Sequence, residues 1–485
     1  MLNNRNLSLL MDFYELTMAN AYFKNGHKDT IAYYDLYFRS APDGAVFAIA
    51  SGLDSVIEYI ENLKFSDKEI DFLRSKNMFD EGFLEYLRNF NFECDIRAIP
   101  EGSVVFPNEP IISVRGPFVQ AQLLETMLLI LINHQSMIAT KTNRVVRAAN
   151  GKAVMEFGSR RAHGADAANF GARAAYIAGA VGSANTLTDY ECNVPALGTM
   201  AHSWIQSFDT EYEAFEVYAK TYPDATVLLV DTYDTLKIGV PNAIKVFDNV
   251  LKPMGKRPKG IRLDSGDLAY LSKKARILLD EAGYEDCPIV ASSSLDEFKI
   301  QDIRLQGGKI DSYGVGERLI TSKSNPVFGG VYKLIAIEKD GEIIPRIKIS
   351  ENVEKITTPG VKQVYRIYDN ETHKAKADLI TLKDETIDTS KSLTIFHPLY
   401  TWKQKTFNNF YVKPLLVPIY ENGKLVYNRP TLDEIRKYCK EEIDSLWDEY
   451  KRFDYPQLYK VDLSQKLWDL KTKLLNETKN KMSKE

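Results

Sequence analysis

Two adjacent arginines, Arg160 and Arg161, are the first candidates for chemistry in this sequence. They follow the apolar run Ala153–Met155 and lie between Gly158 and Gly164. A guanidinium presents a planar set of N–H donors that matches carboxylates and phosphates. An isolated Arg-Arg pair more often binds carboxylates of its own protein. Placed at the end of an expected strand, this pair is also suited to an anionic ligand.

A histidine strengthens that interpretation. His202 comes 42 residues after Arg160, and Thr199 lies just before an expected helix. Thr199 is predicted to cap that helix, which puts His202 in its first turn. The positive end of a helix favours a neutral imidazole and attracts anions. We therefore expect His202 to be a nucleophile beside an anion site.

Two carboxylates, Asp264 and Asp267, follow another apolar strand and are separated by Ser265 and Gly266. Such a pair accepts hydrogen bonds from sugar hydroxyls or binds Mg²⁺. Asp267 is equally suited to cap the helix expected over residues 267–282. Asp264 needs a partner, because an unpaired carboxylate at a buried strand end is costly.

The segment Gly314-Val315-Gly316 follows the last strand of this region. Its glycines let backbone amides approach a phosphate. It is no dinucleotide fingerprint, because the third glycine is absent. Glu317 comes next, and a carboxylate cannot donate a hydrogen bond at neutral pH. Any phosphate here must therefore be held by backbone amides.

Several blocks of this sequence resemble nicotinate phosphoribosyltransferases and occur in that family's order. They are Asp12-Phe13-Tyr14-Glu15-Leu16-Thr17-Met18, Glu156-Phe157-Gly158-Ser159-Arg160-Arg161-Ala162-His163-Gly164, Gly198-Thr199-Met200-Ala201-His202-Ser203-Trp204, Arg262-Leu263-Asp264-Ser265-Gly266-Asp267 and Gly329-Gly330-Val331-Tyr332-Lys333-Leu334. The resemblance covers residues 8–335 and weakens in the last third. Glu317 departs from the threonine that some members carry.

The resemblance implies a reaction of nicotinate with 5-phosphoribosyl 1-diphosphate that gives nicotinate mononucleotide and pyrophosphate. This is the first step of NAD salvage from nicotinate. In the family it is coupled to ATP hydrolysis through a phosphohistidine, and His202 matches that position. The enzyme would then be classed as a ligase. The positions that contact nicotinate are matched by Tyr14, Arg160, Thr199 and Arg262.

The remaining implied roles concern phosphate, metal and oligomer. Phosphate positions are matched by Arg161, Ser265, Gly266, Gly314, Gly316 and Glu317. Asp264 is implied as a catalytic residue facing the ribose, with Asp264 and Asp267 as Mg²⁺ ligands. The expected assembly is a homodimer with shared active sites, in which Tyr14 comes from the second subunit. Since no Walker A sequence occurs, the ATP site is expected to overlap the phosphoribosyl pyrophosphate site.

Alternating strand-like and helical runs must position these residues between 151 and 330. Strand-like runs lie at 152–157, 182–186, 195–198, 225–231, 260–264, 288–292 and 309–315. Helical patterns lie between most of them, which predicts parallel strands with right-handed crossovers. An open sheet and a closed barrel both fit. An irregular α/β barrel is favoured because the polar residues follow strand ends on one face.

The flanking regions predict a second layer. Residues 1–150 are expected to form an α+β domain completed by strands from 331–425, so that the domain is discontinuous. Its first helix is expected over 6–25, with Tyr14 off the apolar stripe. Residues 426–485 are predicted to be a helical segment whose last ten residues are disordered.

Composition restricts the class of protein. The net charge of −4 over 485 residues, with no Lys/Arg block, argues against nucleic acid as a partner. Four cysteines lie far apart without metal-ligand spacing, which favours reduced thiols. Neither an apolar N-terminal region nor an apolar run of about 18 residues is present. We expect a soluble, cytoplasmic protein without a membrane partner.

Three other functions compete with this interpretation. A nicotinamide phosphoribosyltransferase is the nearest, although Arg160 and Arg161 suit a carboxylate better than a neutral amide. A catalytically silent protein on the same scaffold is disfavoured by the presence of His202 and Asp264. A Schiff-base aldolase needs a desolvated lysine at a strand end, and only Lys333 is arguable.

Overall fold

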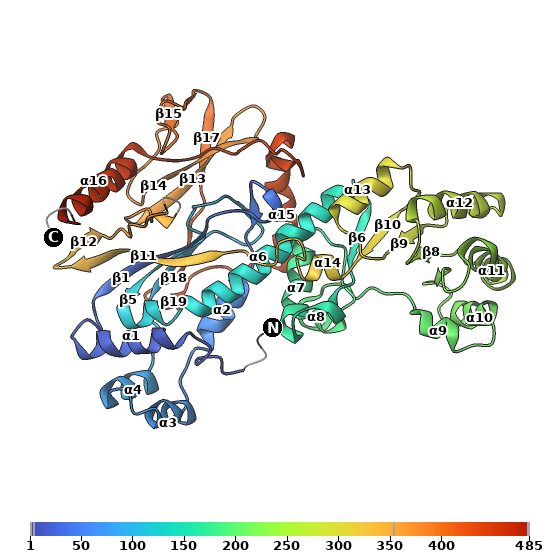
Figure 1. The fold of residues 1–485 in the computed structure, drawn as a ribbon, viewed down its shortest axis with the longest axis horizontal. Helices are drawn as coiled ribbons and strands as arrows, with labels where there is room; N and C mark the ends of the chain where they lie inside the picture. The colour runs from blue at the N-terminus through green and yellow to red at the C-terminus, as the bar shows by residue number, and fades with distance from the viewer. Residues whose placement is uncertain (1, 3–4, 353–354, 483–485) are drawn as a thin grey trace. The chain divides into compact units, whose positions relative to one another are not determined.

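The computed structural model describes residue 2 and residues 5–352 and 355–482, which fold into two compact units. Unit 1 combines Met1–Met137 with Val327–Glu485, and unit 2 is Ile138–Pro326. The chain enters unit 2 within helix α6 (Glu125–Ala148). Both ends of the chain, blue and red in Figure 1, therefore belong to unit 1.

A seven-stranded sheet forms the core of unit 1, in the order β12-β11-β1-β5-β3-β18-β19. Strand β1 (Ile31–Phe38) is antiparallel to both β11 (Gly330–Lys339) and β5 (Ile112–Pro117). Figure 1 shows the blue β1 beside the yellow-orange β11. Nearly every residue of β1 is buried, as expected for a strand covered on both faces. The other strands are β3 (Asp95–Ala98), β12 (Glu342–Pro345), β18 (Val417–Glu421) and β19 (Lys424–Leu425).

A second sheet of unit 1 has the order β17-β13-β14-β20. Its strands are β13 (Lys362–Asp369), β14 (Ala375–Leu382), β17 (Phe410–Pro414) and β20 (Val461–Leu463). The shorter strands pair as β2 (Ala48–Ile49) with β4 (Val104–Val105) and β15 (Leu393–Phe396) with β16 (Gln404–Phe407). Within the segment 331–425, from which strands were expected, β11–β12, β13–β14 and β18–β19 pair as antiparallel hairpins.

The helices of unit 1 lie around these sheets. They are α1 (Phe13–Lys24), η1 (Pro42–Gly44), α2 (Leu53–Glu61), α3 (Asp67–Ser75), α4 (Glu81–Arg88), α5 (Phe118–Gln122), α15 (Leu432–Ser445), η7 (Asp448–Lys451) and α16 (Gln465–Met482). Helix α16 continues to Met482, so the predicted disorder is wrong for residues 476–482. Residues 483–485 lie outside the described chain. Strand β20 also interrupts the segment predicted to be helical.

A buried ion cluster joins the second sheet to helix α15. The Arg366 guanidinium donates to Asp378 at 2.7 and 2.9 Å and to Glu442 at 2.7 Å. One oxygen of Glu109 accepts from the Phe106 amide, and the other has no donor among the described residues. Burial and the charge of Asp378 raise the pKa of Glu109 well above its usual value. Both effects favour the protonated form of Glu109 beside Asp378.

This proton predicts a pH dependence of stability. A raised folded pKa contributes stability below the unfolded pKa, and that contribution is lost as pH rises through the folded pKa. Glu109→Gln keeps a donor toward Asp378, so its cost should be only about 1 kcal/mol near neutral pH. Urea unfolding should show a smaller loss of stability at alkaline pH in this variant than in the wild type. An unchanged alkaline loss would contradict a protonated Glu109. Asp378→Asn removes a charge paired with Arg366, so it should lower the free energy of unfolding at every pH.

Unit 2 contains a five-stranded parallel sheet in the order β6-β10-β9-β8-β7. Its strands are β6 (Ala153–Glu156), β7 (Val227–Leu229), β8 (Gly260–Leu263), β9 (Ile289–Ala291) and β10 (Ser312–Val315). They lie where the sequence predicted strands. The predicted strands 182–186 and 195–198 are reduced to isolated bridges, in which Ser183 pairs with both Glu156 and Ala196.

Helices follow most strands of unit 2, as the alternation predicted. They are η2 (Ser159–Arg161), α7 (Ala165–Ile177), α8 (Thr186–Cys192), α9 (His202–Gln206), α10 (Glu211–Thr221), η3 (Thr235–Gly239), α11 (Val240–Val246), η4 (Phe247–Leu251), η5 (Lys252–Met254), α12 (Leu268–Glu281), α13 (Glu297–Leu305) and α14 (Glu317–Ile320). Gly239 is required by packing, because a Cβ there would overlap the Val230 carbonyl at the end of β7.

The structure confirms a mixed α/β class, whereas the predicted barrel is not closed. Within the described part of unit 2, β7 forms one edge of the sheet and the bridge at Ala196 the other, with no recorded pair between them. Strand β7 has only three residues, and the segment at Ala196 has a single bridge. These short segments leave few backbone groups to pair across the gap.

One helical run, Phe118–Ala148, is long and apolar enough to cross a bilayer by length and composition. In its most apolar window, 67% is buried inside the protein. Burial of this extent is typical of a core helix.

Candidate functional site

The carboxyl ends of β7, β8 and β9 bring a polar cluster together in unit 2. Asp231 follows β7, and its Oδ2 accepts from the Asp264 amide at 2.9 Å and from Ser265 Oγ at 2.6 Å. Ser292, at the end of β9, donates to Asp264 Oδ1. The next residues, Ser293 and Ser294, have positive φ values of 107° and 49°. Backbone strain of this kind clusters at ligand sites.

Arg262 organises this cluster. Its Nε donates to Ser292 Oγ at 2.8 Å and its Nη2 to Asp264 Oδ1 at 2.8 Å. Its Nη1 donates to Thr199 Oγ1 at 2.9 Å and to the Met200 carbonyl at 3.3 Å. A guanidinium has five N–H donors, so one on Nη2 remains for a ligand. Arg262 therefore fixes three chain segments and keeps one donor unused by the described residues.

His202 lies between two of these groups. Its Nδ1 is 3.1 Å from Thr232 Oγ1, and its Nε2 is 3.6 Å from Asp264 Oδ2. Burial raises the pKa of Asp264, but the hydrogen bond from Ser292 and the charge of Arg262 outweigh it and lower the pKa below its usual value. Asp264 is therefore an anion beside His202. The His202 side chain is 39% exposed, which leaves it open to a ligand.

The predicted cap at Thr199 is wrong. Helix α9 begins at His202 with Ala201 as its N-cap, and it is only five residues long. Thr199 precedes the cap, and its hydroxyl accepts from Arg262 instead. A helix of five residues has few aligned peptide dipoles, so the field at its N-terminus is weak. The helix end therefore does not explain why His202 would be a nucleophile. Thr232 and Asp264 orient it instead. The longer helix of this region, α10, is capped by Thr210.

Arg160 and Arg161 lie in the 3-10 turn η2, directly after β6. Both are exposed, and neither takes part in an ion pair with another described residue. The alternative in which this pair neutralises carboxylates of its own protein is therefore not supported. In a chain of net charge −4, two unpaired guanidiniums on one turn are suited to an anionic ligand.

The turn with the arginines packs against the Gly-x-Gly segment. A Cβ on Gly314 would lie 2.6 Å from the Phe157 ring, and one on Gly316 would lie 3.0 Å from the Phe157 carbonyl. These glycines therefore allow a close approach of two segments. Beside them lies an open pocket of about 370 Å³, lined by Arg161, His163, Glu317, Thr321, Lys323 and Pro326.

The Glu317 carboxylate is paired with Lys323 and is therefore not available to a ligand. Lys323 Nζ donates to its Oε1 at 2.7 Å, and this hydrogen bond lowers the pKa of Glu317. An ionised Glu317 cannot donate to a phosphate. Arg161, His163 and Lys323 are then the side-chain donors of this pocket.

The two predicted metal ligands differ in their surroundings. Asp267 Oδ1 accepts from the Tyr270 amide at 2.9 Å and caps α12. Ser265 and Gly266 are exposed in the loop before it. Asp231 Oδ1 is buried and accepts no hydrogen bond, although it lies beside the Asp264 loop. Among the described residues no group of three or more acidic, histidine or cysteine side chains forms a ready cation site. Asp231 and Asp264 fit Mg²⁺ better than Asp267, because they lie next to each other in the cluster and Asp231 Oδ1 accepts no hydrogen bond.

Tyr14 lies in unit 1, on α1, and is 43% exposed. Burial and the Glu125 carboxylate, to which the phenol donates, raise its pKa. The helix starts at Phe13 rather than residue 6, because Asp12 and Glu15 form a capping box. Phe13 is itself 49% exposed, so the predicted apolar stripe is not the buried face. Tyr14 is about as exposed as Phe13, so its exposure does not depend on the predicted stripe.

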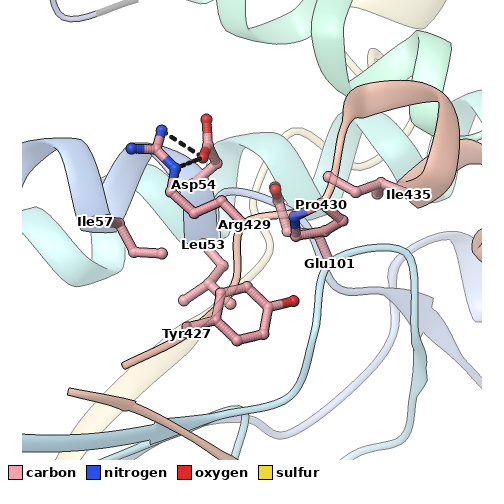
Figure 2. A pocket seen from close by; sticks show the side chains of 8 residues that line it. All are labelled: Leu53, Asp54, Ile57, Glu101, Tyr427, Arg429, Pro430 and Ile435. Atoms are coloured by element: carbon pink, nitrogen blue, oxygen red, sulfur yellow. Dashed lines mark hydrogen bonds and ion pairs between the residues drawn. The ribbon is translucent and has the colours of Figure 1, made fainter. Parts of the chain in front are cut away.

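A second pocket, in unit 1, is too small for a substrate. Figure 2 shows it between Tyr427, Leu53 and Ile435, with Arg429 bonded to Asp54. Its volume is about 10 Å³, no more than one water molecule needs.

Three residues of the cluster were not assigned a role from the sequence. Asp231 and Ser292 are the last residues of the predicted strands 225–231 and 288–292. A polar residue at such a strand end is the signal that could have identified them. Thr232 carries no sequence signal, because only the fold brings it to His202.

Three family models match the chain in order. Residues 9–133 match the nicotinate phosphoribosyltransferase N-terminal domain, residues 152–372 the nicotinate phosphoribosyltransferase family, and residues 361–471 the C-terminal domain. Together they cover most of the chain, including every residue of the candidate site.

Comparison with full-length proteins and with a solved structure identifies the same family. A nicotinate phosphoribosyltransferase of Bacillus subtilis is 45% identical over 481 residues, covering 99% of this chain and 97% of the relative. One of Dictyostelium discoideum is 35% identical, covering 95% and 87%. The crystal structure of human nicotinic acid phosphoribosyltransferase superposes with a TM-score of 0.85 at 29% identity, covering 96% of this chain and 99% of the human one.

Proposed function

The chain belongs to the nicotinate phosphoribosyltransferase family, and from this premise we propose how its residues perform that family's reaction. The enzyme joins nicotinate to 5-phosphoribosyl 1-diphosphate, giving nicotinate mononucleotide and pyrophosphate. The observation that carries the substrate assignment is the pair of unpaired, exposed arginines after β6. In our proposal Arg160 binds the nicotinate carboxylate, and Arg161 binds phosphate.

The transfer step needs positioning more than acid–base chemistry. The nicotinate ring nitrogen attacks C1 of the ribose, the C1–O bond to diphosphate breaks, and pyrophosphate leaves with the electron pair. Positive charge develops on the ribose meanwhile. Asp264 is ionised and is held by Arg262 and Ser292, so it would stabilise that charge without having to reorient. Arg262 would contribute its remaining donor to the nicotinate side, next to Thr199.

A divalent cation fits the carboxylate side of this cluster. We propose that Asp231 and Asp264 hold Mg²⁺, whose charge would neutralise the diphosphate. The free, buried Oδ1 of Asp231 supports this assignment. Asp267 then serves mainly to cap α12, with its second oxygen as an alternative ligand.

Coupling to ATP would use His202. An imidazole nitrogen attacks the γ-phosphorus, an N–P bond forms, the bond to the bridging oxygen breaks, and ADP leaves. The proximity of His202 to Asp264 and to the Arg262 cluster supports this role. Phosphate groups of the substrates would contact Arg161, Ser265, Gly266 and the backbone of Gly314–Glu317. The pocket lined by Arg161, His163 and Lys323 supports that placement.

Three further proposals concern architecture and setting. We infer that the open sheet and its two bridges are the wall of an irregular barrel, since the strand ends collect the polar residues. We propose a homodimer in which Tyr14 enters the partner's site, and sedimentation of the purified chain would test it. We also propose a cytoplasmic location, consistent with four free cysteines.

The decisive assay compares substrates. Nicotinate with 5-phosphoribosyl 1-diphosphate and ATP should give mononucleotide and pyrophosphate, and nicotinamide should react at least about 100-fold less well, because a neutral amide leaves a guanidinium unpaired. Omitting ATP should slow synthesis without abolishing it. Equal turnover of the acid and the amide would contradict the proposal and favour a nicotinamide phosphoribosyltransferase. If the protein turns over neither nicotinate nor nicotinamide, it is a catalytically silent protein on the same scaffold.

A further inference from the structure

A buried glutamate lies directly before the arginine turn. Glu156 is the last residue of β6, and it is completely buried. Its Oε1 accepts a hydrogen bond from the Gly158 amide, and its Oε2 accepts one from Ser183 Oγ at 2.6 Å. No lysine, arginine or histidine pairs with it among the residues that the structure places. Hydrogen bonds alone therefore hold this carboxylate.

These contacts fix the start of the turn in three directions. Gly158 bonds back to Glu156, while the Phe157 amide donates to the Val315 carbonyl at 2.8 Å. A Cβ on Gly158 would lie 2.6 Å from Ile320, so the backbone fits tightly there. The Arg161 amide then donates to the Gly158 carbonyl at 2.7 Å. The backbone conformation of the turn that carries both arginines therefore depends on Gly158.

The second oxygen of Glu156 reaches the neighbouring strand segment. Ser183 Oγ donates to Glu156 and accepts from the Asn185 amide at 3.0 Å. Asn185 in turn caps helix α8 by accepting from the Leu187 amide at 3.1 Å. One carboxylate thus ties the arginine turn to the bridge at Ser183 and to the start of α8.

We propose that Glu156 is a positioning residue for substrate recognition: its carboxylate fixes the Gly158 turn and thereby the direction in which Arg160 presents its guanidinium. The inference rests on the proposed role of Arg160 in binding the nicotinate carboxylate. Bidentate recognition of a carboxylate depends strongly on direction, so a small shift of the turn weakens it. Because Glu156 acts by accepting hydrogen bonds, its negative charge is not required.

Four variants separate this role from ordinary stability. Glu156→Ala removes both acceptors, and Glu156→Gln keeps an acceptor for Gly158. Ser183→Ala removes the second contact. Ser272→Ala is the matched control: Ser272 is also fully buried in unit 2, and its Oγ accepts from the Lys309 amide at 3.0 Å. Each serine variant loses one buried hydroxyl that accepts a backbone amide.

The measurements are KM and kcat for nicotinate and nicotinamide, with thermal unfolding in parallel. Losing one oriented hydrogen bond corresponds to about a tenfold change, so Glu156→Ala should raise KM for nicotinate about tenfold or more. It should also lower the ratio of kcat/KM for nicotinate to kcat/KM for nicotinamide. The kcat for nicotinate should fall by a much smaller factor than the rise in KM. Ser183→Ala should show a weaker form of both effects, and Glu156→Gln should recover most of the lost preference. Ser272→Ala should lower the unfolding temperature like Ser183→Ala but keep the wild-type preference.

Two results would overturn the inference. If Glu156→Ala and Ser272→Ala lose stability alike and both keep the wild-type preference, Glu156 is structural only. If Glu156→Gln is as impaired as Glu156→Ala, its charge is required and the positioning argument is wrong. Failure of the proposed function itself is recognised separately, because Arg160→Ala would then leave the preference for the acid unchanged.

Discussion

Replacing His202 with alanine should abolish acid-labile labelling of the protein by ATP that carries a labelled γ-phosphate. ATP hydrolysis should fall to background with it, because His202 is the imidazole that the structure places beside Asp264 and Thr232. A slow, ATP-independent synthesis of nicotinate mononucleotide should remain at high substrate concentration. The reason is that Asp264, Arg262 and Thr199 hold one another without any contribution from His202. The phosphoryl group would therefore drive the reaction without entering the transfer step.

His163→Ala is the matched control for this experiment. His163 lines the neighbouring pocket and is exposed, so it is the next histidine a phosphoryl group could reach. Its variant should retain full labelling. Labelling that persists in His202→Ala and disappears in His163→Ala would move the phosphohistidine to residue 163. Loss of all synthesis in His202→Ala, with unfolding unchanged, would instead give His202 a part in the transfer itself.

Arg160→Ala should lose about 2–5 kcal/mol of transition-state binding for nicotinate, the range for truncating one partner of a desolvated charge pair. This corresponds to a fall in kcat/KM of roughly 30- to 5,000-fold. The loss for nicotinamide should be much smaller, since its amide carries no charge. Stability should change little, because the structure gives Arg160 no ion pair with a described residue to lose.

Arg257→Ala is the comparison for the loss of an arginine as such. Arg257 is an arginine of the same unit that pairs with Asp286 on the surface. Its variant should keep wild-type kinetics with both substrates. If Arg160→Ala lowers kcat/KM equally for the acid and the amide, Arg160 does not recognise the carboxylate. Arg161→Ala would then be the next variant to measure.

The sequence predicted the strands of unit 2 well because they are short, apolar and bounded by polar residues. Buried parallel strands read in this way, and each polar residue marks the end where a ligand binds. Asp264 and Thr199 were therefore placed on one face from the strand ends, whereas Arg262 was assigned from the family resemblance. The structure brings these three residues into direct contact.

Thr199 shows where sequence reasoning failed. A threonine before an apolar periodic run is a good local signal for a helix cap. Here a tertiary contact outweighs the local signal. Arg262, on a strand 63 residues away, donates a hydrogen bond to the Thr199 hydroxyl. No local pattern contains that contact. Closure of a barrel is likewise outside local patterns, because pairing of sheet edges depends on segments that are far apart in the chain.

Asp267 and the Gly-x-Gly segment show a third limit, in which one residue fits two roles. A carboxylate before a helix reads as a metal ligand or as a cap, and the structure records the cap. Gly314 and Gly316 read as a phosphate loop, yet both are required by the packing of Phe157. Only the neighbours of a residue in space distinguish such alternatives.

The pairing of β1 with β11 affects how the protein is synthesised. Phe38 and Gly330 face each other across the sheet, so β1 lacks one neighbour until roughly 300 further residues have left the ribosome. At about 5–20 residues per second this takes on the order of 15–60 seconds. Unit 2 is a single continuous segment, Ile138–Pro326, and is complete before that moment. Unit 2 is therefore fully synthesised before β1 gains its second neighbour, and until then an apolar strand edge near the N-terminus is open to aggregation or to a chaperone.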